Sequence, residues 1–412
     1  MGRGGEEIDA SRLLYGDRLP RRSARTLFLP SPQIIFAPEL LGGDMPDLSS
    51  VRISGDSVSM ICKAPGEPER LLLARDGQAG ELFLSDRGPQ LGPYGFSLQH
   101  QAMRWGRDLF AWETDEGWGM AVSTSDGEAP PRTTSSVYGP LASETRMALI
   151  KGYPYMAWFE LSGQGDEGLR LYEGPQEDCF DPAKAVVSFP VAVIGEPGNI
   201  KAIYNPYAEV VTAVWSEQSD GVVRIRTWSS FSGQPATTLH AYDGDETAEI
   251  LDLEQRPDGS LVTFWANERS QRGVLVGDEP APGDGKRVCA EVLALDKGEI
   301  LSTHVDPASR VMVKPGSAST EYAMLNSGEE DVVSHFLAGP SSPRVVYKSV
   351  SPAGQEEIMS YDPESGSRSK VCDGAGVDLL GARTAENGQV EAVIRDRNGS
   401  AASDQISSIA VL

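Results

Sequence analysis

The sequence is poor in basic residues relative to acidic ones, and it has few cysteines and histidines. Its 412 residues contain 36 Lys and Arg against 60 Asp and Glu, which gives a formal charge of -24 at pH 7. Binding to nucleic acid or to an anionic membrane surface needs cationic side chains that neutralise phosphates. We therefore expect neither a nucleic-acid partner nor a membrane partner. The acidic residues are spread along the chain, which is typical of a soluble, self-repelling surface.

Targeting segments are also missing from the sequence. The N-terminal stretch MGRGGEEIDASRLLYGDRLPRRSART has no apolar core of a signal peptide, and Glu6, Glu7 and Asp9 do not suit a mitochondrial presequence. No window is long and apolar enough for a membrane-spanning helix. We therefore expect the protein to be cytoplasmic.

Familiar catalytic and metal-binding motifs are absent as well. The four cysteines, Cys62, Cys179, Cys289 and Cys372, form no CxxC pair and have no histidine close by, so the sequence predicts neither a zinc site nor a disulfide framework. There is no GxSxG elbow, Walker loop, dinucleotide-binding glycine fingerprint or HExxH helix. Hydrolase, nucleotide-binding and zinc-protease functions therefore have no support.

What the sequence does contain is a repeated pair of apolar runs. The stretch RPDGSLVTFWANERSQRG, residues 256–273, has a turn signal, an apolar run ending at Trp265, a polar break and a second run. The same arrangement occurs eight times, at intervals of 34 to 57 residues. The equivalent positions are Cys62, Trp112, Trp158, Trp215, Trp265, Val313, Tyr347 and Ile394.

This repeat predicts an all-β chain that forms a single β-propeller. Three or four short strands per unit of roughly 50 residues, with little helical periodicity, are typical of that fold. We expect eight blades. The interval of 34 residues between Val313 and Tyr347 has room for only about three strands. Either the sixth blade lacks its outer strand, or the ring has seven blades and one irregular insertion, which is the alternative.

The ends of the chain are also placed by this prediction. Residues 25–412 would form the propeller, and residues 1–24 a polar, mobile lead. An N-terminal strand, from RTLFLP or QIIFAPEL, would pair with the last blade and close the ring.

A turn such as RPDG followed by an apolar strand resembles the repeats of TolB-like and prolyl-oligopeptidase-type propellers. This resemblance spans most of the chain and implies the propeller fold. We expect the large apolar residue at the end of each run to pack between blades, because periodic apolar positions mark a buried face.

Three of the four histidines fall in strands that we predict to be innermost, lining the central channel. His100, His304 and His335 precede their repeat positions by 12, 9 and 12 residues, so they would lie at similar depths. Imidazoles that face one cavity can bind a metal ion or transfer protons near neutral pH. The alternative is a purely structural role, since a histidine on a strand can simply be a hydrogen-bonded core or surface residue. We take His304 and His335, on neighbouring blades, as a candidate catalytic pair, with His100 across the ring.

The arrangement is similar to that of oligogalacturonate lyases, which are propellers whose channel metal is held by histidines and a glutamine. Gln99 and Gln101 flank His100 here, but no motif matches, so no residue role is carried over. The resemblance leaves a divalent metal in the channel as an open alternative, and the sequence itself indicates no particular cofactor.

Other polar side chains on the predicted innermost strands are candidates for ligand binding. Asp252 and Glu254 are two positions apart and therefore point the same way from a strand, as carboxylates must to share a proton or an ion. Mixed charges around one channel suit a polar or anionic organic ligand. The full set is Arg146, Lys201, Tyr204, Asp252, Glu254, Asp306, Asp378 and Arg383.

Two functions from different classes follow from these observations. In the first, the chain binds a polar small molecule at its channel and catalyses a non-hydrolytic lyase, isomerase or cyclisation step through His304 and His335. In the second, it is a non-catalytic scaffold that binds a protein partner with one rim, by analogy with other propellers. A large exposed patch on one rim would favour the scaffold. The linear sequence shows none, so we prefer the first.

Overall fold

The computed structural model describes only part of the 412-residue chain. The described residues are 32–41, 45–63, 70–75, 78–82, 98–103, 107–114, 117–124, 131–139, 145–153, 157–162, 169–173, 187–189, 193, 195–206, 208–230, 235–256, 258–267, 272–277, 279–280, 288–297, 299–305, 308–314, 323–325, 330–385, 387–397 and 404–411. RTLFLP and the predicted N-terminal lead lie outside these ranges.

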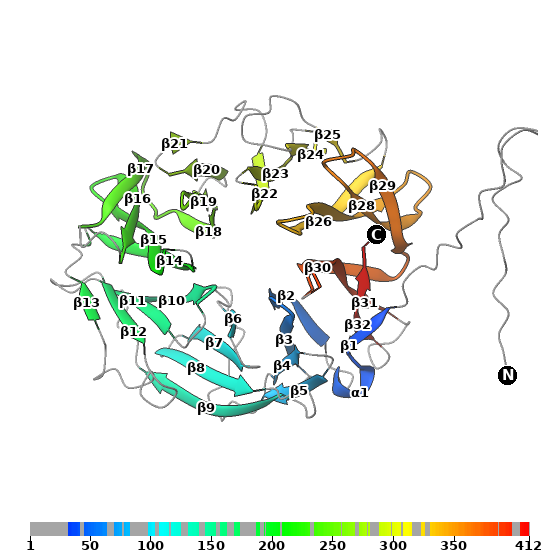
Figure 1. The fold of residues 1–412 in the computed structure, drawn as a ribbon, viewed down its shortest axis with the longest axis horizontal. Coiled ribbons are helices and arrows are strands. Elements are labelled where there is room, and N and C mark those ends of the chain that lie inside the picture. The colour runs from blue at the N-terminus through cyan, green and yellow to red at the C-terminus, as the bar shows by residue number, and fades with distance from the viewer. Residues whose placement is uncertain are drawn as a thin grey trace, which may run out of the picture.

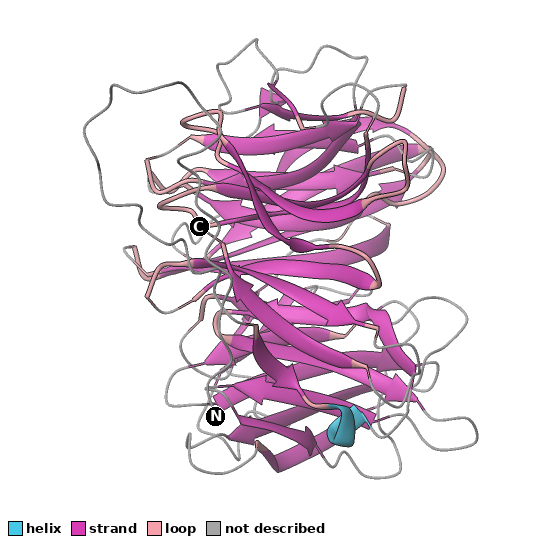
Figure 2. Cartoon of the chain, turned by 90° about the vertical axis from the view of Figure 1, so that its right-hand side faces the viewer, coloured by secondary structure: helices cyan, strands magenta, loops and turns pink. Residues whose placement is uncertain are grey.

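Short β-strands make up nearly all of the described chain, together with one short helix, α1 (Pro38–Leu41) (Figure 2). The strands of the first half are β1 (Gln33–Phe36), β2 (Met45–Ser54), β3 (Ser57–Lys63), β4 (Arg70–Arg75), β5 (Gln78–Leu82), β6 (Gln99–Met103), β7 (Arg107–Thr114), β8 (Gly117–Thr124), β9 (Arg132–Gly139), β10 (Thr145–Lys151), β11 (Ala157–Ser162), β12 (Leu169–Glu173), β13 (Val187–Phe189), β14 (Glu196–Asn205), β15 (Val210–Ser219), β16 (Val222–Ser229) and β17 (Thr237–Asp243). Those of the second half are β18 (Glu249–Gln255), β19 (Leu261–Ala266), β20 (Arg272–Val276), β21 (Glu279–Pro280), β22 (Val288–Ala294), β23 (Ile300–Val305), β24 (Val311–Lys314), β25 (Ala323–Met324), β26 (Asp331–Ala338), β27 (Arg344–Val350), β28 (Glu356–Tyr361), β29 (Arg368–Asp373), β30 (Val377–Thr384), β31 (Val390–Asp396) and β32 (Gln405–Ala410).

The sheets surround a common centre, so the chain is a single all-β propeller, as the repeat predicts (Figure 1). The strands of each four-stranded unit pair antiparallel in chain order, as in β2-β3-β4-β5, except that the last unit, β30-β31-β32-β1, takes its fourth strand from the start of the described chain. The first strand of each unit lies nearest the centre (Figure 1). These innermost strands are β2, β6, β10, β14, β18, β22, β26 and β30.

The described strands form seven hydrogen-bonded sheets, so the prediction of eight blades is wrong and the alternative of seven is the one that the structure shows. Six sheets have four strands and one has eight, in the order β13-β12-β11-β10-β14-β15-β16-β17. The difference arises at one junction, where Ile150 and Lys151 of β10 pair in parallel with Ala202 and Ile203 of β14. Each half of the eight-stranded sheet is itself a four-stranded antiparallel unit, and backbone hydrogen bonds merge the two.

The N-terminal strand β1 lies in the same sheet as the last three strands of the chain. It pairs antiparallel with β32, with Gln33 opposite Ser408 and Ile34 opposite Ser407. This sheet has the order β1-β32-β31-β30, so its outer strand comes from the opposite end of the chain.

One of the eight repeat positions has a different place in its sheet from the others. Cys62, Trp112, Trp215 and Tyr347 lie on the second strand of their units, but Val313 lies on β24, the third strand. The interval of 34 residues therefore reflects this displaced position, and not a missing strand, because β22 to β25 make a full four-stranded sheet.

The core lies between the sheets and contains the expected large apolar side chains. Trp112 and Trp215 have exposed fractions of 0%, which confirms that these positions are buried. Trp112 faces Gly119 of the neighbouring strand, and a Cβ atom added at Gly119 would stand 2.2 Å from the indole ring. The indole therefore fills the space that any other residue at that position would occupy.

Side chains of the innermost strands connect neighbouring units. Gln99 of β6 donates from Nε2 to the Met147 carbonyl at 2.9 Å and accepts from the Leu149 N–H at 2.8 Å, both on β10. Asn199 of β14 makes the same pair of bonds to the carbonyl and N–H of Ile250 on β18, at 2.8 and 2.7 Å. Each amide takes the place of a backbone strand partner, so neighbouring units are joined at the centre of the ring.

Candidate functional site

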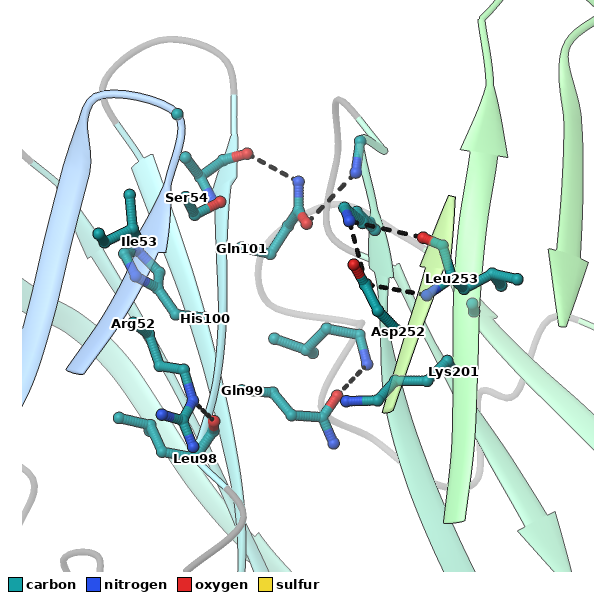
Figure 3. A pocket seen from close by; sticks show the side chains of 16 residues that line it. Arg52, Ile53, Ser54, Leu98, Gln99, His100, Gln101, Lys201, Asp252 and Leu253 are labelled. Atoms are coloured by element: carbon teal, nitrogen blue, oxygen red, sulfur yellow. Dashed lines mark hydrogen bonds and ion pairs between the residues drawn. The ribbon is translucent and has the colours of Figure 1, made fainter. Parts of the chain in front are cut away.

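The innermost strands enclose a pocket of about 530 Å³ at the centre of the ring, which we call the channel pocket (Figure 3). Its walls come from β2, β6, β10, β14 and β18. The charged side chains in the lining are those of Arg52, Lys151, Lys201 and Asp252. A surplus of cations over carboxylates here contrasts with the net charge of -24 for the whole chain.

Lys151 is held in an ion-pair cluster at the edge of the channel pocket. Its Nζ lies 3.2 Å from Asp252 Oδ1 and 2.6 Å from Glu254 Oε1. Burial would lower the pKa of the ammonium group, but the two carboxylates outweigh it and raise that pKa. Because Asp252 and Glu254 both contact Nζ of Lys151, their side chains point the same way from β18, as expected. Burial and the nearby Asp252 charge raise the pKa of Glu254 against the effect of Lys151.

Lys201 stands in a different environment. Its side chain extends from β14 across the channel pocket toward the side on which Gln99 lies (Figure 3). In the part of the chain that the structure describes, no carboxylate forms an ion pair with its Nζ. Burial lowers the pKa of this amine, and the positive charges of Arg52 and Lys151 lower it further, while Asp252 opposes them.

Arg52 and two glutamines shape the opposite wall of the channel pocket. Arg52 donates from Nε to the Leu98 carbonyl at 2.8 Å, which brings a permanent positive charge from β2 to the start of β6. Gln101 accepts from the Gly152 N–H at 3.3 Å. With the bonds of Gln99 to β10 described above, these contacts hold the wall through backbone groups.

His100 lies in a buried hydrogen-bonded chain. Its Nδ1 is 3.0 Å from Ser59 Oγ, its Nε2 is 2.7 Å from Asp108 Oδ1, and its ring stacks on Phe110 with centroids 4.6 Å apart. The order Ser–His–Asp is that of a hydrolase triad. However, Ser59, the Asp108 side chain and the imidazole each have an exposed fraction of 0%, so no substrate reaches the hydroxyl. This chain of bonds joins two sheets.

The prediction that His304 lies on an innermost strand is wrong. His304 belongs to β23, the second strand of its sheet, because the repeat was aligned on Val313 of the third strand. Its Nε2 lies 2.9 Å from Ser302 Oγ. The innermost strand of this sheet is β22, which carries Glu291.

His335 does lie on an innermost strand, β26, but its bond is to Thr303, with Nε2 2.8 Å from Oγ1. Thr303 and His304 are neighbours on β23 and point to opposite faces of the sheet. His304 therefore faces away from His335, and the predicted pair does not form. Burial lowers the pKa of His335 to about 4, so the ring is neutral near pH 7.

The remaining predicted residues spread over several strands. Arg146 is on β10, and Tyr204 on β14 makes an edge-on contact with Tyr153, with ring centroids 4.9 Å apart. On β30, Asp378 pairs with Arg397. Asp306 lies outside the described residues.

Arg383, also on β30, connects the sheet of β30 to that of β2. It pairs with Glu391 at 2.8 Å and donates from Nη1 to the Asp56 carbonyl at 2.6 Å. Of the predicted ligand-binding residues, the channel pocket therefore brings together Lys201 and Asp252, with Glu254 beside them.

Within the described ranges, no three His, Cys, Asp or Glu side chains lie close enough together to hold a metal ion. No helix in the same ranges is long and apolar enough to cross a membrane.

The sequence prediction missed three charged residues near the channel. Lys151 was taken as part of the turn KGYP, and Arg52 lies just before the first turn signal. Glu291 was missed because β22 was not recognised as the innermost strand. Burial raises the pKa of Glu291 to about 8, although its Oε2 accepts a hydrogen bond from the Leu337 N–H at 2.9 Å.

The chain is similar in fold to solved propeller structures, whereas no protein-family model and no curated protein matches it. The Dos1 propeller is 9% identical with a TM-score of 0.50, and the match covers 90% of this chain and 96% of that one. A puromycin hydrolase is 16% identical with a TM-score of 0.48, covering 89% of this chain and 60% of that one. Oligopeptidase B from Leishmania major is 10% identical with a TM-score of 0.44, covering 88% and 55%.

These comparisons define a class of fold. At such low identities the likeness shows the β-propeller architecture alone. The chain spans less than two thirds of the length of the hydrolase and the oligopeptidase. It is a β-propeller protein, in agreement with the resemblance read from its repeats.

Proposed function

We propose that this propeller binds a small organic anion in the channel pocket. The observation that carries the proposal is Lys201, whose amine reaches into the pocket without a carboxylate partner among the described residues. An anionic group beside this amine would favour its positively charged form and accept a charge-assisted hydrogen bond from it. Arg52 and Lys151 add positive charge to the same space.

The size and composition of the channel pocket support the same proposal. Its volume of about 530 Å³ falls within the range of roughly 300–1,000 Å³ typical of small-molecule sites. Its lining combines apolar residues such as Ile53 and Leu149 with a few charged groups, as sites for small organic molecules do. A polar ligand with one or two anionic groups suits this mixture.

Calorimetric titration of the purified chain with small carboxylates and organic phosphates tests the proposal. We expect Lys201→Met to weaken binding by about tenfold or more, the usual effect of losing a charge-assisted hydrogen bond. Lys297→Met is the matched control, because Lys297 is about half exposed and pairs with Glu299 and Glu364 on the surface. Equal affinity of the two variants for every anion would contradict the proposal.

Proton uptake gives a second, independent readout. The pKa of Lys201 is below its ordinary value of 10.5, and a bound anion would raise it. At a pH where the free amine is partly neutral, binding should therefore take up protons. Titrations in buffers of different ionisation enthalpy measure this uptake, which Lys201→Met should abolish.

A lyase or isomerase step in the channel pocket is proposed to depend on Lys201 and Asp252, and not on the histidines. The imidazole of His100 is fully buried, and His304 is on a second strand with its ring bonded to Ser302. Lys201 can accept a proton when neutral, and Asp252, with 42% of its side chain exposed, can exchange protons with water.

The scaffold function remains the alternative. It would need an exposed apolar or strongly charged patch on one rim. Among the described residues the large exposed apolar side chains are Ile34 and Val333, which lie on β1 and β26 in different sheets. A chain that binds no small anion but carries a protein partner when purified from its source would favour the scaffold.

A further inference from the structure

We propose that Lys201 captures the carbonyl carbon of an anionic aldehyde or ketone as an imine in the channel pocket. This inference rests on the proposed function, because it names the chemical class of the ligand that the pocket takes. It adds a covalent step to binding, and that step is tested separately from binding.

The positions of the two lysines of the channel pocket distinguish them. Lys151 Nζ is held by carboxylates at 2.6 and 3.2 Å, and 47% of its side chain is exposed. Lys201 Nζ has no ion pair among the described residues and extends into the space between β6 and β18 (Figure 3). A nucleophilic amine needs a lone pair that is neither protonated nor engaged, so Lys201 has the environment for this chemistry.

The charges around Lys201 favour its neutral form. Burial lowers its pKa first, and Arg52 and Lys151 lower it further, while Asp252 and Glu249 act in the opposite direction. The same two cations attract the anionic part of a ligand. A carbonyl group that carries a carboxylate or a phosphate would therefore be held by Arg52 and Lys151 while its carbon meets the amine.

The proposed step balances without an oxidant or reductant. The Lys201 nitrogen forms a bond to the carbonyl carbon, and the C=O electron pair moves to oxygen, which takes up a proton. The nitrogen gives up its two protons, one to this oxygen as the carbinolamine forms and one as the oxygen leaves as water, which leaves the C=N bond of the imine. Asp252 is the nearby carboxylate that can relay protons between the nitrogen, the oxygen and solvent.

Reductive trapping tests the proposal on the full-length chain. The protein is incubated with glyoxylate or with pyridoxal 5′-phosphate, reduced with borohydride and digested, and the modified lysines are identified by peptide mass spectrometry. We expect Lys201 to be modified first, with about tenfold or more selectivity over Lys151, because each pKa unit changes the neutral fraction about tenfold. The Lys201→Arg variant should show no modification at position 201, whereas the Lys297→Arg variant should still be modified at Lys201.

Glycolate, which has the carboxylate of glyoxylate but no carbonyl, is the matched ligand. Binding of both compounds with trapping of glyoxylate at Lys201 supports the inference. Binding of both without trapping overturns the imine and leaves the proposed function standing. Trapping spread over surface lysines according to their exposure also overturns the imine. If neither compound binds and no lysine is trapped, the proposed function is overturned together with the imine. Thermal melts of the variants separate a lost amine from a lost fold.

Discussion

His100 and Asp108 form a fully buried pair in which Nε2 of the imidazole lies 2.7 Å from Oδ1 of the carboxylate. Arg75 adds a contact to the other carboxylate oxygen at 3.1 Å, and Ser59 contacts the far side of the imidazole. The four side chains come from β3, β4, β6 and β7, so one charged group inside the core joins two sheets.

We predict that Asp108→Asn lowers the free energy of unfolding by about 3–5 kcal/mol, because the Arg75 charge loses its nearer carboxylate partner and keeps Asp56 at 3.8 Å. Burial would raise the pKa of Asp108, but His100 and Arg75 outweigh it and lower that pKa. The stabilisation that ionised Asp108 gives the folded chain is therefore fully present above the ordinary pKa of 3.8, and it is lost as pH falls below that value. Urea denaturation checks both statements. Glu364→Gln, in a surface ion pair, should change little.

The amide of Gln99 is predicted to hold the sheets of β6 and β10 together. Gln99→Leu leaves the Met147 carbonyl and the Leu149 N–H without this partner, so we expect a loss of about 1–3 kcal/mol for each group that stays buried. Gln355→Leu is the control, because Gln355 is exposed and bonds to Glu357. Chemical denaturation measures the difference. Equal stability of the two variants would show that water replaces the amide bonds.

Glu291 should make stability depend on pH. Between the ordinary value of 4.5 and its folded pKa of about 8, the folded chain holds a proton that the unfolded chain releases. The free energy of unfolding therefore falls as pH rises, on the order of 1.4 kcal/mol per pH unit within this window. Glu291→Gln keeps an oxygen that can accept the hydrogen bond of the Leu337 N–H, but it removes the carboxyl group that titrates.

We expect the melting temperatures of the wild type and Glu291→Gln to diverge in favour of the variant as pH rises from 4.5 to 8. Glu299→Gln, at an exposed position, controls for the loss of one negative charge. A constant difference between the melting temperatures of the wild type and Glu291→Gln across this pH range would contradict a raised pKa of Glu291.

The strand β1 should contribute strongly to stability through a single side chain. Phe36 is fully buried beside Leu41 and Ile406, so Phe36→Ala is expected to lower the free energy of unfolding by about 3–5 kcal/mol. Ile34, on the same strand, is 51% exposed, and Ile34→Ala should change stability by less than about 1 kcal/mol. Denaturation of the two variants tests whether β1 fastens the ends of the chain through its buried face. If Phe36→Ala and Ile34→Ala both changed the free energy of unfolding only slightly, this role of β1 would be contradicted.

Turn signals and apolar runs predicted the propeller because they describe local structure. Trp112 and Trp215 were expected to be buried, and they are. The sequence was misleading where two strands look alike. ILSTHV and RVMV are both apolar runs beside the turn DPAS, so the second strand was taken for the first and Val313 for the repeat position. The seam between β10 and β14 leaves no mark in either strand, because a parallel pairing depends on how closely two units approach.

The channel pocket was predicted only in part for a similar reason. Lys201, Asp252 and Glu254 were selected because they are polar residues on innermost strands. Lys151 contacts Asp252 across 101 positions of the chain, and this meeting follows from the curvature of the ring. The histidines, by contrast, were selected for their chemistry, and their bonds to Ser59, Ser302 and Thr303 follow from packing that no local pattern records.

The parallel seam between β10 and β14 also affects how the ring can deform. At this junction the two units share backbone hydrogen bonds. The junction from β6 to β10 is instead bridged by the side-chain amides of Gln99 and Gln101, and the junction from β14 to β18 by the amide of Asn199. Thermal breathing of the ring should therefore concentrate at those two side-chain junctions and spare the seam. Lys151 and Lys201 sit on the two seam strands, so the spacing between the two amines should stay constant while the walls on either side widen and narrow around a ligand.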